Sequence, residues 1–336
     1  MSFLQLNSDF YFFHYSFKDV IRKITITKEA CISFLQQHGV LDSWKTCPGP
    51  LVKGVRLNNC GQQMALKAVK DRNDGVTWRC RKVHQVIDGD KTYKVKDVKV
   101  SIRSGTWMED SNLELESIVE MMYLWAHAFN MAEMEHELKL SKTTLIEWTA
   151  YFRDVALHTC FRNSVQIGGP GIEVEIDESK FGKRKYHRGH RVEGKWVFGG
   201  RETYDKSKIF MIAVPNRKAA TLLPIIKRWI AAGSIIHSDC WKSYNKLSTM
   251  GYTHITVNHS KHFVDEETAA CTNRIESEWR HAKTSLPKYG VHKGLHDGYL
   301  AQFLWHRRFY QSDKFLTLME HCNETFRNGD MTSCNI

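Results

Sequence analysis

The sequence predicts an α/β protein in which a region of alternating strands and helices follows a helical region and a turn-rich one. Three observations lead to this fold class. Residues 172–285 follow the order strand, strand, strand, helix, strand, helix, strand, helix. Residues 112–163 carry apolar side chains at helical spacing, and residues 47–99 contain turns and short alternating runs. A hydrophobic content of 42% excludes wholesale disorder.

Composition limits the class of protein further. A chain of 336 residues has room for two or three domains of about 100–200 residues each. The net charge of +11 and the pI of about 9.1 favour a polyanionic partner. Nine scattered cysteines do not resemble a disulfide framework, so we expect a reducing compartment. We find neither a signal peptide nor an apolar span of about 18 residues, and we expect a soluble, intracellular protein without a membrane partner.

These patterns divide the chain into five segments, and the first two are small. The N-terminal segment covers residues 1–45 and contains a helix over 24–39, with Thr27 as its N-cap and Gly39 as its C-cap. The turn-rich region covers residues 46–105 and contains short strands at 75–80 and 91–96.

The helical region covers residues 106–166. Apolar residues recur at helical spacing from Leu113 to Phe129, a second helix covers 131–138, and Ser141 caps a third. The tight polar break at residues 139–141 is typical of a DNA-binding helix-turn-helix, and it is equally compatible with an ordinary helical bundle.

The α/β domain covers residues 170–312, after the boundary GGPG at 168–171, and a C-terminal tail covers 313–336. Its predicted elements come in a fixed order. They are strands at 172–176, 196–203 and 208–214, a helix at 218–232, a strand at 234–237, a short helix after Asp239, a strand at 252–257, and a helix at 272–285.

Three carboxylates stand out in this domain. Asp177 and Asp239 each follow an apolar strand, and Glu276 lies in the last helix. Strand ends meet at one edge of a sheet, and a helix packed there adds a third acid. Such a cluster repels itself unless cations neutralise it, so we expect two Mg²⁺ or Mn²⁺ ions, which suit phosphoryl transfer. The spacings of 62 (239 − 177) and 37 (276 − 239) residues fit an RNase H-like core, as in retroviral integrases.

The acidic helix carries further candidates. Asn273, Glu276 and Lys283 share one face, where the amide and the amine can position a scissile phosphate. Trp279 is interpreted as a packing anchor rather than a base-stacking residue. Each acid also has an ordinary reading, since a lone Asp at a strand end is usually a turn residue and a lone helical Glu is usually solvated. We assign four nearby acids to that ordinary class: Glu175, Glu178, Glu278 and Asp265.

A basic segment follows Asp177 directly. Residues 180–191 contain no acid and six basic residues: Lys180, Lys183, Arg184, Lys185, Arg188 and Arg191. Beside a metal site such a loop would contact the DNA backbone. A solvated hairpin or a nuclear-localisation cluster is the alternative interpretation.

Several of these segments, taken in order, resemble the Merlin superfamily of DNA transposons and the related bacterial insertion-sequence transposases. The matching residues are 175–182 (EIDESKFG), 237–244 (HSDCWKSY), 257–260 (VNHS), 263–265 (FVD) and 272–283 (TNRIESEWRHAK). The likeness covers about residues 170–310, and it extends weakly over 47–170 through 101–107 (SIRSGTW). It implies an RNase H-like DDE domain with Asp177, Asp239 and Glu276 as the triad and Lys283 as the accompanying basic residue.

The chain departs from that family at two places. Members often carry an N-terminal zinc ribbon with paired cysteines, and here residues 46–105 would be a degenerate ribbon, because Cys47 and Cys80 lack close partners. Cys47, Cys60, Cys80 and His84 still offer four ligands for a structural Zn²⁺. Near Glu276, the chain has Glu266, Ala270 and Cys271 where members tend to have Pro, Gly and His.

The resemblance implies metal-dependent cut-and-paste transposition at terminal inverted repeats, with double-stranded DNA as partner. We expect a homodimer or larger assembly on DNA, located in the nucleus of a eukaryotic host or in the cytoplasm of a bacterial one. Three alternatives remain: a transposase-derived DNA-binding protein without catalysis, a nuclease without strand transfer, and a zinc-dependent regulatory protein in which the acids are incidental.

Overall fold

The computed structural model describes residues 14–52, 55–56, 60–88, 91–182, 194–257, 272–286 and 296–331. The chain forms two compact units, one comprising Met1–Val155 with Ser312–Ile336 and the other Ala156–Gln311. The five-segment division made from the sequence is a finer partition and stays a prediction. Across the described ranges, no helix combines the length and the apolar character needed to cross a membrane.

The first unit has a helical core around α3 (Leu115–Ala126), which contacts α2 (Lys28–Gln37) and α9 (Lys314–Arg327). The predicted N-terminal helix is confirmed as α2, because the Thr27 side chain accepts the Ala30 N–H and Gly39 follows in the left-handed region (φ +67°). Two short elements precede it: α1 (Phe17–Asp19) and the π-helical η1 (Val20–Ile24).

The three predicted helices of the helical region are all present. After α3 come α4 (Met131–Leu138) and α5 (Lys142–Arg162). Lys139 ends α4 with φ +54°, and the Ser141 hydroxyl accepts the Thr144 N–H at 3.1 Å, so the tight break lies where the sequence indicated.

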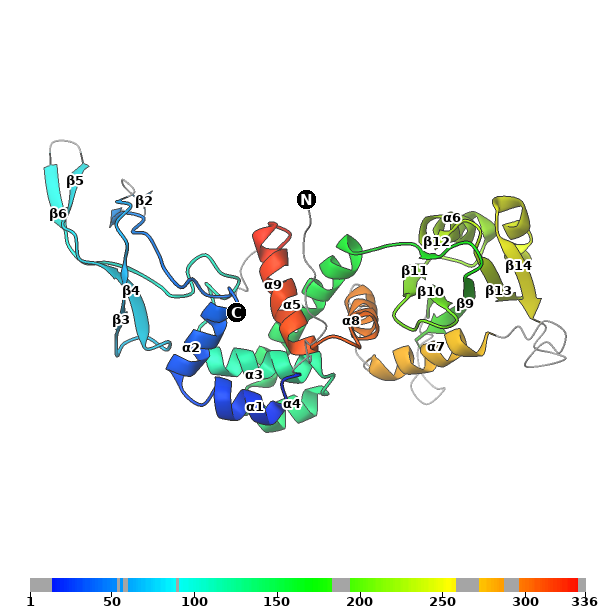
Figure 1. Cartoon of the computed structure of the whole chain (residues 1–336), viewed down its shortest axis with the longest axis horizontal. Coiled ribbons are helices and arrows are strands. Elements are labelled where there is room, and N and C mark those ends of the chain that lie inside the picture. Colours follow the sequence, from blue (N-terminus) through cyan, green and yellow to red (C-terminus); the bar gives the residue numbers. More distant parts are fainter. Residues whose placement is uncertain are drawn as a thin grey trace, which may run out of the picture. The chain divides into compact units, whose positions relative to one another are not determined.

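The turn-rich region forms short sheets, drawn in blue and cyan in Figure 1. Its largest sheet has three antiparallel strands in the order β3-β4-β7, and two further pairs are β1-β2 and β5-β6. The bounds are β1 Leu51–Val52, β2 Val55–Arg56, β3 Ala65–Ala68, β4 Val76–Cys80, β5 His84–Asp88, β6 Lys91–Val95 and β7 Val98–Val100.

Residues 313–336, interpreted from the sequence as a tail, contain the helix α9. Asp313 caps it by accepting the Leu316 N–H, and it buries Phe315, Leu318 and Met319 in the first unit. The tail interpretation is therefore wrong, since Phe315, Leu318, Met319 and Cys322 recur at the spacing of one helix face.

The second unit is built on a five-stranded sheet in the order β11-β10-β9-β13-β14. The first three strands are antiparallel neighbours, while β13 runs parallel to both β9 and β14. The bounds are β9 Glu173–Phe181, β10 Lys195–Glu202, β11 Ile209–Val214, β13 Ile235–Asp239 and β14 Thr253–Val257. The mixed α/β class predicted for this region is therefore confirmed.

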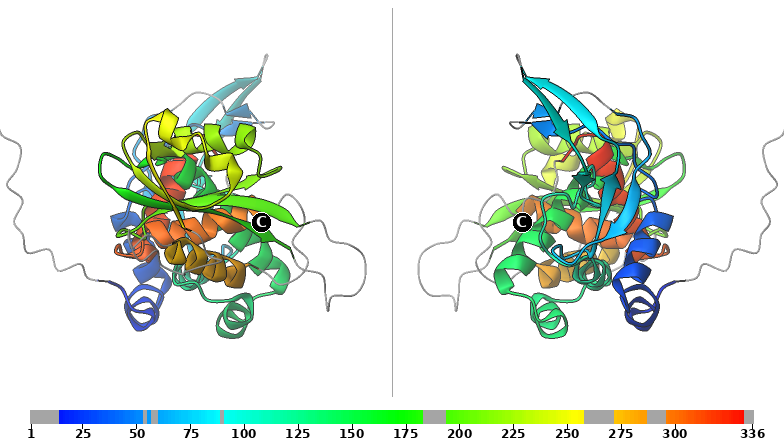
Figure 2. Two further views of the ribbon diagram at one scale, coloured as in Figure 1. Left: turned by 90° about the vertical axis from the view of Figure 1, so that its right-hand side faces the viewer. Right: turned by 90° about the vertical axis from the view of Figure 1, so that its left-hand side faces the viewer.

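Helices cover both faces of this sheet. One face packs on α6 (Ala219–Trp229) through Val174, Ile176 and Phe198, and the other packs on α7 (Asn273–Ser285) and α8 (His296–Arg308) through Phe181 and Val197. Figures 1 and 2 show α6 on one side of the strands and α7 and α8 on the other. The remaining elements are β8 (Ile167–Gly168), β12 (Ile230–Ala231), and the 3₁₀ turns η3 (Lys242–Tyr244) and η4 (Leu247–Met250), which replace one predicted helix.

Candidate functional site

Asp177 lies inside a strand and not behind one. β9 continues to Phe181, and Asp177 is paired with Gly199 of β10. The predicted strand end at residue 176 is therefore wrong. The polar residues after Asp177 continue the strand because β10 pairs with them along their whole length.

Asp239 is the last residue of β13, as predicted. β13 is parallel to β9, with Ile235 beside Glu173 and His237 beside Glu175. Continuing that register by two residues (237 + 2 and 175 + 2) brings Asp239 level with Asp177. Two carboxylates from segments 62 residues apart thus stand on neighbouring strands at one end of the sheet.

Helix α7 is attached to β9 at three successive points of the same strand face. Glu175 accepts the N–H groups of two residues at the start of the helix at 2.9 and 3.0 Å, Trp279 Nε1 donates to Asp177 Oδ2 at 3.0 Å, and Lys283 Nζ donates to Ser179 Oγ at 2.6 Å. The strand residues are two apart and the helix side chains are four apart. Both spacings keep side chains on one face, so strand and helix run alongside each other.

The third acid, Glu276, is in the first turn of α7 and is exposed. It accepts the Thr272 hydroxyl at 3.3 Å. Burial raises the pKa of Asp177 to about 6, against the effect of its hydrogen bonds with Glu178 and Trp279. The carboxylates of Asp239 and Glu276 raise this pKa further, so all three acids lie within electrostatic reach of one another.

The opposite face of β9 carries a second buried acid. Glu178 is 9% exposed and accepts a short hydrogen bond from the Tyr244 hydroxyl. Burial raises the pKa of Glu178 to about 7, although the bond from Tyr244 lowers it. This side chain is part of the core beneath the carboxylates.

The assignment of Glu175, Glu178 and Glu278 to solvated or turn positions is wrong, because all three are buried. Glu175 is 1% exposed and anchors α7, and Glu278 is 4% exposed and pairs with Arg201 at 3.6 Å and Arg307 at 2.8 Å. Residues 175, 177 and 179 alternate along β9, and this spacing indicates that they share the face that contacts α7. A strand that ends at residue 176 does not include the last two of them. Asp265 lies outside the described residues.

Trp279 is confirmed as a packing anchor. It is 4% exposed, and its ring lies edge-on to Phe181 with the centroids 6.0 Å apart. Gly199 makes room for it, because a Cβ at that position would be 2.7 Å from Trp279 Cη2 and 3.0 Å from the Phe210 carbonyl oxygen. The hydrogen bond that this indole gives to Asp177 was not foreseen.

The predicted DNA-binding residues are only partly visible. Lys180, Asn273 and Lys283 are exposed, and Lys180 Nζ lies 5.5 Å from the Trp196 ring centroid. Five lie outside the described residues: Lys183, Arg184, Lys185, Arg188 and Arg191. The motifs at 258–260 and 263–265, with Glu266, Ala270 and Cys271, also lie outside them.

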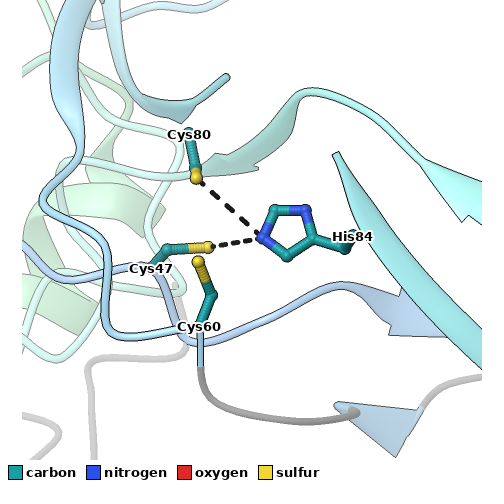
Figure 3. Close-up of side chains that lie close together, drawn as sticks. All are labelled: Cys47, Cys60, Cys80 and His84. Carbon is teal, nitrogen blue, oxygen red and sulfur yellow. Dashed lines mark hydrogen bonds between the residues drawn. The ribbon is translucent and has the colours of Figure 1, made fainter. Parts of the chain in front are cut away.

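The first unit contains a cluster of three cysteines and one histidine (Figure 3). The sulfur atoms of Cys47, Cys60 and Cys80 and one ring nitrogen of His84 all lie within 4.8 Å of one another. His84 Nε2 is 3.5 Å from Cys47 Sγ and 3.9 Å from Cys80 Sγ. Tetrahedral zinc would place such sulfur and nitrogen atoms about 3.6 Å apart, so the four side chains converge with suitable spacing although no CxxC pair is present.

Strand ends and a backbone hydrogen bond position these ligands. Cys80 ends β4 and His84 begins β5. Cys60 precedes Gly61, whose N–H donates to the Cys47 carbonyl at 3.2 Å. Burial opposes ionisation of Cys60, but hydrogen bonds from the Gln62 backbone and from neighbouring cluster side chains lower its pKa to about 7. A lowered thiol pKa favours the thiolate, which is the metal-binding form.

Comparison with known proteins identifies a family and two relatives. The model of the ISXO2-like transposase domain matches residues 166–309. An uncharacterized transposase-like protein of Haemophilus influenzae is 37% identical over 109 residues, which are 32% of this chain and 85% of that protein. Male abnormal protein mab-31 of Caenorhabditis elegans is 24% identical over 169 residues, or 48% of this chain and 36% of that protein.

The packing of Trp279 on Gly199 gives a first prediction. Gly199→Ala should lower the free energy of unfolding by about 1–3 kcal/mol, because the new methyl group overlaps the indole. Trp279→Phe removes the overlapping ring atoms, so in that background the same substitution should cost less. Chemical denaturation of the two single variants and the double variant measures this coupling. Strictly additive costs would contradict it.

The raised pKa of Asp177 gives a second prediction. Because the folded state disfavours the ionised form of Asp177, ionisation lowers the free energy of unfolding. This destabilisation is absent below the unfolded pKa and complete above about pH 6. Asp177→Asn should therefore stabilise the metal-free protein at about pH 8, on the order of 1–2 kcal/mol. At about pH 4.5 the gain should largely disappear. Thermal unfolding without added divalent ions tests this, with the exposed Asp71→Asn as control, and equal gains at both pH values would refute it.

Proposed function

This chain belongs to the ISXO2-like transposase family, and from that premise we propose that it is a DDE transposase that cuts DNA at transposon terminal inverted repeats and joins the freed ends to target DNA. In the first step, water attacks the phosphodiester at the transposon end. In the second, the freed 3′-hydroxyl attacks the target strand in line.

The proposal includes an RNase H-like fold for the catalytic domain. The order β11-β10-β9-β13-β14, with antiparallel strands on one side of β9 and parallel strands on the other, supports it. Parallel strands that end side by side present their terminal residues at one edge, which is where ligands bind in open α/β sheets.

We propose that Asp177, Asp239 and Glu276 hold two Mg²⁺ or Mn²⁺ ions. When bound, two such ions activate the attacking oxygen and stabilise the leaving one. The carboxylate oxygens suit these hard cations, and the mutual electrostatic effect on Asp177 is the repulsion that cations would relieve. In this proposal all three carboxylates would serve as ligands of these ions.

The chain's own N–H groups orient two of these carboxylates. Trp279 Nε1 holds Asp177 Oδ2, and the backbone N–H of Trp241 holds Asp239 Oδ1, each at 3.0 Å. Fixed carboxylate geometry before substrate arrives reduces the reorganisation needed during the reaction.

DNA would be bound by basic and helical elements. We propose that Lys180, Asn273 and Lys283 contact the backbone near the cleaved bond, together with the basic segment that follows residue 182. The helical region from α3 to α5 would hold the transposon ends. Two ends must be processed together, so a dimer or larger assembly on DNA is expected, in the nucleus of a eukaryotic host or the cytoplasm of a bacterium.

The cluster of Cys47, Cys60, Cys80 and His84 would bind one structural Zn²⁺. The zinc would tie together segments that share only a small apolar core with Met64 and Trp78. A purely regulatory zinc protein would not need the paired carboxylates of the second unit.

The observation that carries the proposal is the position of Asp177 and Asp239 on adjacent parallel strands, whose register, continued by two residues, brings them level. The acidic helix is anchored beside them to Glu175 and Asp177. It separates this function from the alternatives only in part. A nuclease without strand transfer would use the same three acids. A DNA-binding relic would retain the fold without needing the acids.

A third prediction tests the reaction. With Mg²⁺ or Mn²⁺, the protein should cleave a duplex carrying the element's own terminal repeat and produce joined products, and Asp239→Asn should reduce both to background. Asp71→Asn should leave both intact. Cleavage without joining would support the nuclease, and specific binding without cleavage would support the DNA-binding relic.

A fourth prediction concerns zinc. Purified protein should contain about one zinc ion per chain, and Cys80→Ser should lose it. Cys240→Ser removes an exposed thiol outside the cluster and should keep it. Metal analysis by mass spectrometry gives the result. Equal zinc content in the two variants, or none in the wild type, would contradict the site.

A further inference from the structure

An arginine is stacked between two tryptophans at the end of the sheet that carries Asp239. The Arg217 guanidinium lies 4.1 Å from the Trp196 ring centroid and 4.5 Å from that of Trp241. The three residues come from separate elements, since Trp196 is in β10, Arg217 precedes α6 and Trp241 follows β13. Such contacts gain cation–π attraction and hold the groups flat against one another.

The stack is held in place by hydrogen bonds to the backbone. The Arg217 carbonyl oxygen accepts from Trp241 Nε1 at 3.1 Å and from the Ser243 hydroxyl at 2.8 Å. The backbone N–H of Trp241 donates to Asp239 Oδ1. One tryptophan therefore joins the stack directly to a proposed metal ligand.

The outer member of the stack is open to solvent. Trp241 is 39% exposed, although the stack and a hydrogen bond to the Arg217 carbonyl fix its orientation. Trp196 and Arg217 are half-buried, and two exposed lysines flank the stack, Lys180 over Trp196 and Lys242 next to Trp241. The surroundings are thus aromatic and basic.

Aromatic rings interleaved with cations are the usual means of binding unpaired nucleic acid, because bases stack on the rings while the cations meet the phosphates. A tryptophan and arginine pair is also common at protein–protein contacts. The adjacent lysines and the link to Asp239 favour the nucleic acid. A base within a duplex is already stacked on both sides, so only an unpaired base could use this surface.

We propose that Trp196, Arg217 and Trp241 form a stacking platform that receives an unpaired nucleobase of the DNA strand lying at the Asp177–Asp239 site. This inference rests on the proposed function for the identity of the strand. The platform would bind and position the DNA end. It would prefer ends that are frayed or that have an extruded base next to the cleaved phosphate.

The test separates base stacking from phosphate attraction. Binding of the full-length protein is measured by fluorescence anisotropy, without divalent ions, to single-stranded oligothymidine and to an oligomer of equal length made of abasic sites. Both probes carry the same phosphates. The wild type should bind oligothymidine more tightly, and Trp241→Ala should weaken that binding roughly 5- to 100-fold while leaving the abasic probe unchanged.

Two further variants control for folding and for tryptophan in general. Trp241→Phe keeps an aromatic face and should retain most of the preference. Trp44 is 63% exposed in the other unit, and Trp44→Ala should bind like the wild type. Unchanged thermal unfolding of Trp241→Ala shows that the variant is folded.

Equal weakening on both probes, or no preference in the wild type, would overturn the platform. The cleavage assay is read separately. If no protein cleaves but Trp241→Ala loses the base preference, the platform stands and the transposase proposal fails. If cleavage proceeds and Trp241→Ala binds both probes like the wild type, the platform fails and the transposase proposal stands.

Discussion

The arrangement of the candidate site depends on the attachment of α7 to one face of β9. Glu175, Asp177 and Ser179 meet the helix at its start, at Trp279 and at Lys283. Asp177 is also a proposed metal ligand. The hydrogen bond from Trp279 therefore both holds the helix on the sheet and orients the Asp177 carboxylate. This attachment also brings Glu276, in the first turn of α7, within electrostatic reach of Asp177.

This arrangement concentrates negative charge where it is costly to bury. Glu175 and Glu178 lie within the core on opposite faces of the strand that carries Asp177. Glu175 is compensated by the N–H groups at the start of α7, where the helix dipole also favours an anion. Glu178 is compensated by the Tyr244 hydroxyl. Asp177 and Glu178 both have neighbouring like charges, and the pKa of each is raised.

The sequence predicted the succession of elements in the second unit well, because its buried strands alternate or run apolar between clear turns. It failed where polar residues take a structural role. The strand was predicted to end before Glu178 and Ser179, because their partners, Tyr244 and Lys283, are distant in sequence. The four residues of the cluster around His84 are far apart in sequence and include no CxxC pair, yet the fold brings their ligand atoms together. Local patterns do not encode such long-range convergence.

The position of α9 has a consequence for the order in which the protein is made. Phe315, Leu318 and Met319 complete the core of the first unit, yet they are synthesised after the whole of the second. On the ribosome, the segment 156–311 can therefore acquire its sheet while the residues before it still expose the surface that α9 will cover. A nonsense mutation between residues 312 and 327 would spare the carboxylates of the second unit and truncate the helix that completes the core of the first.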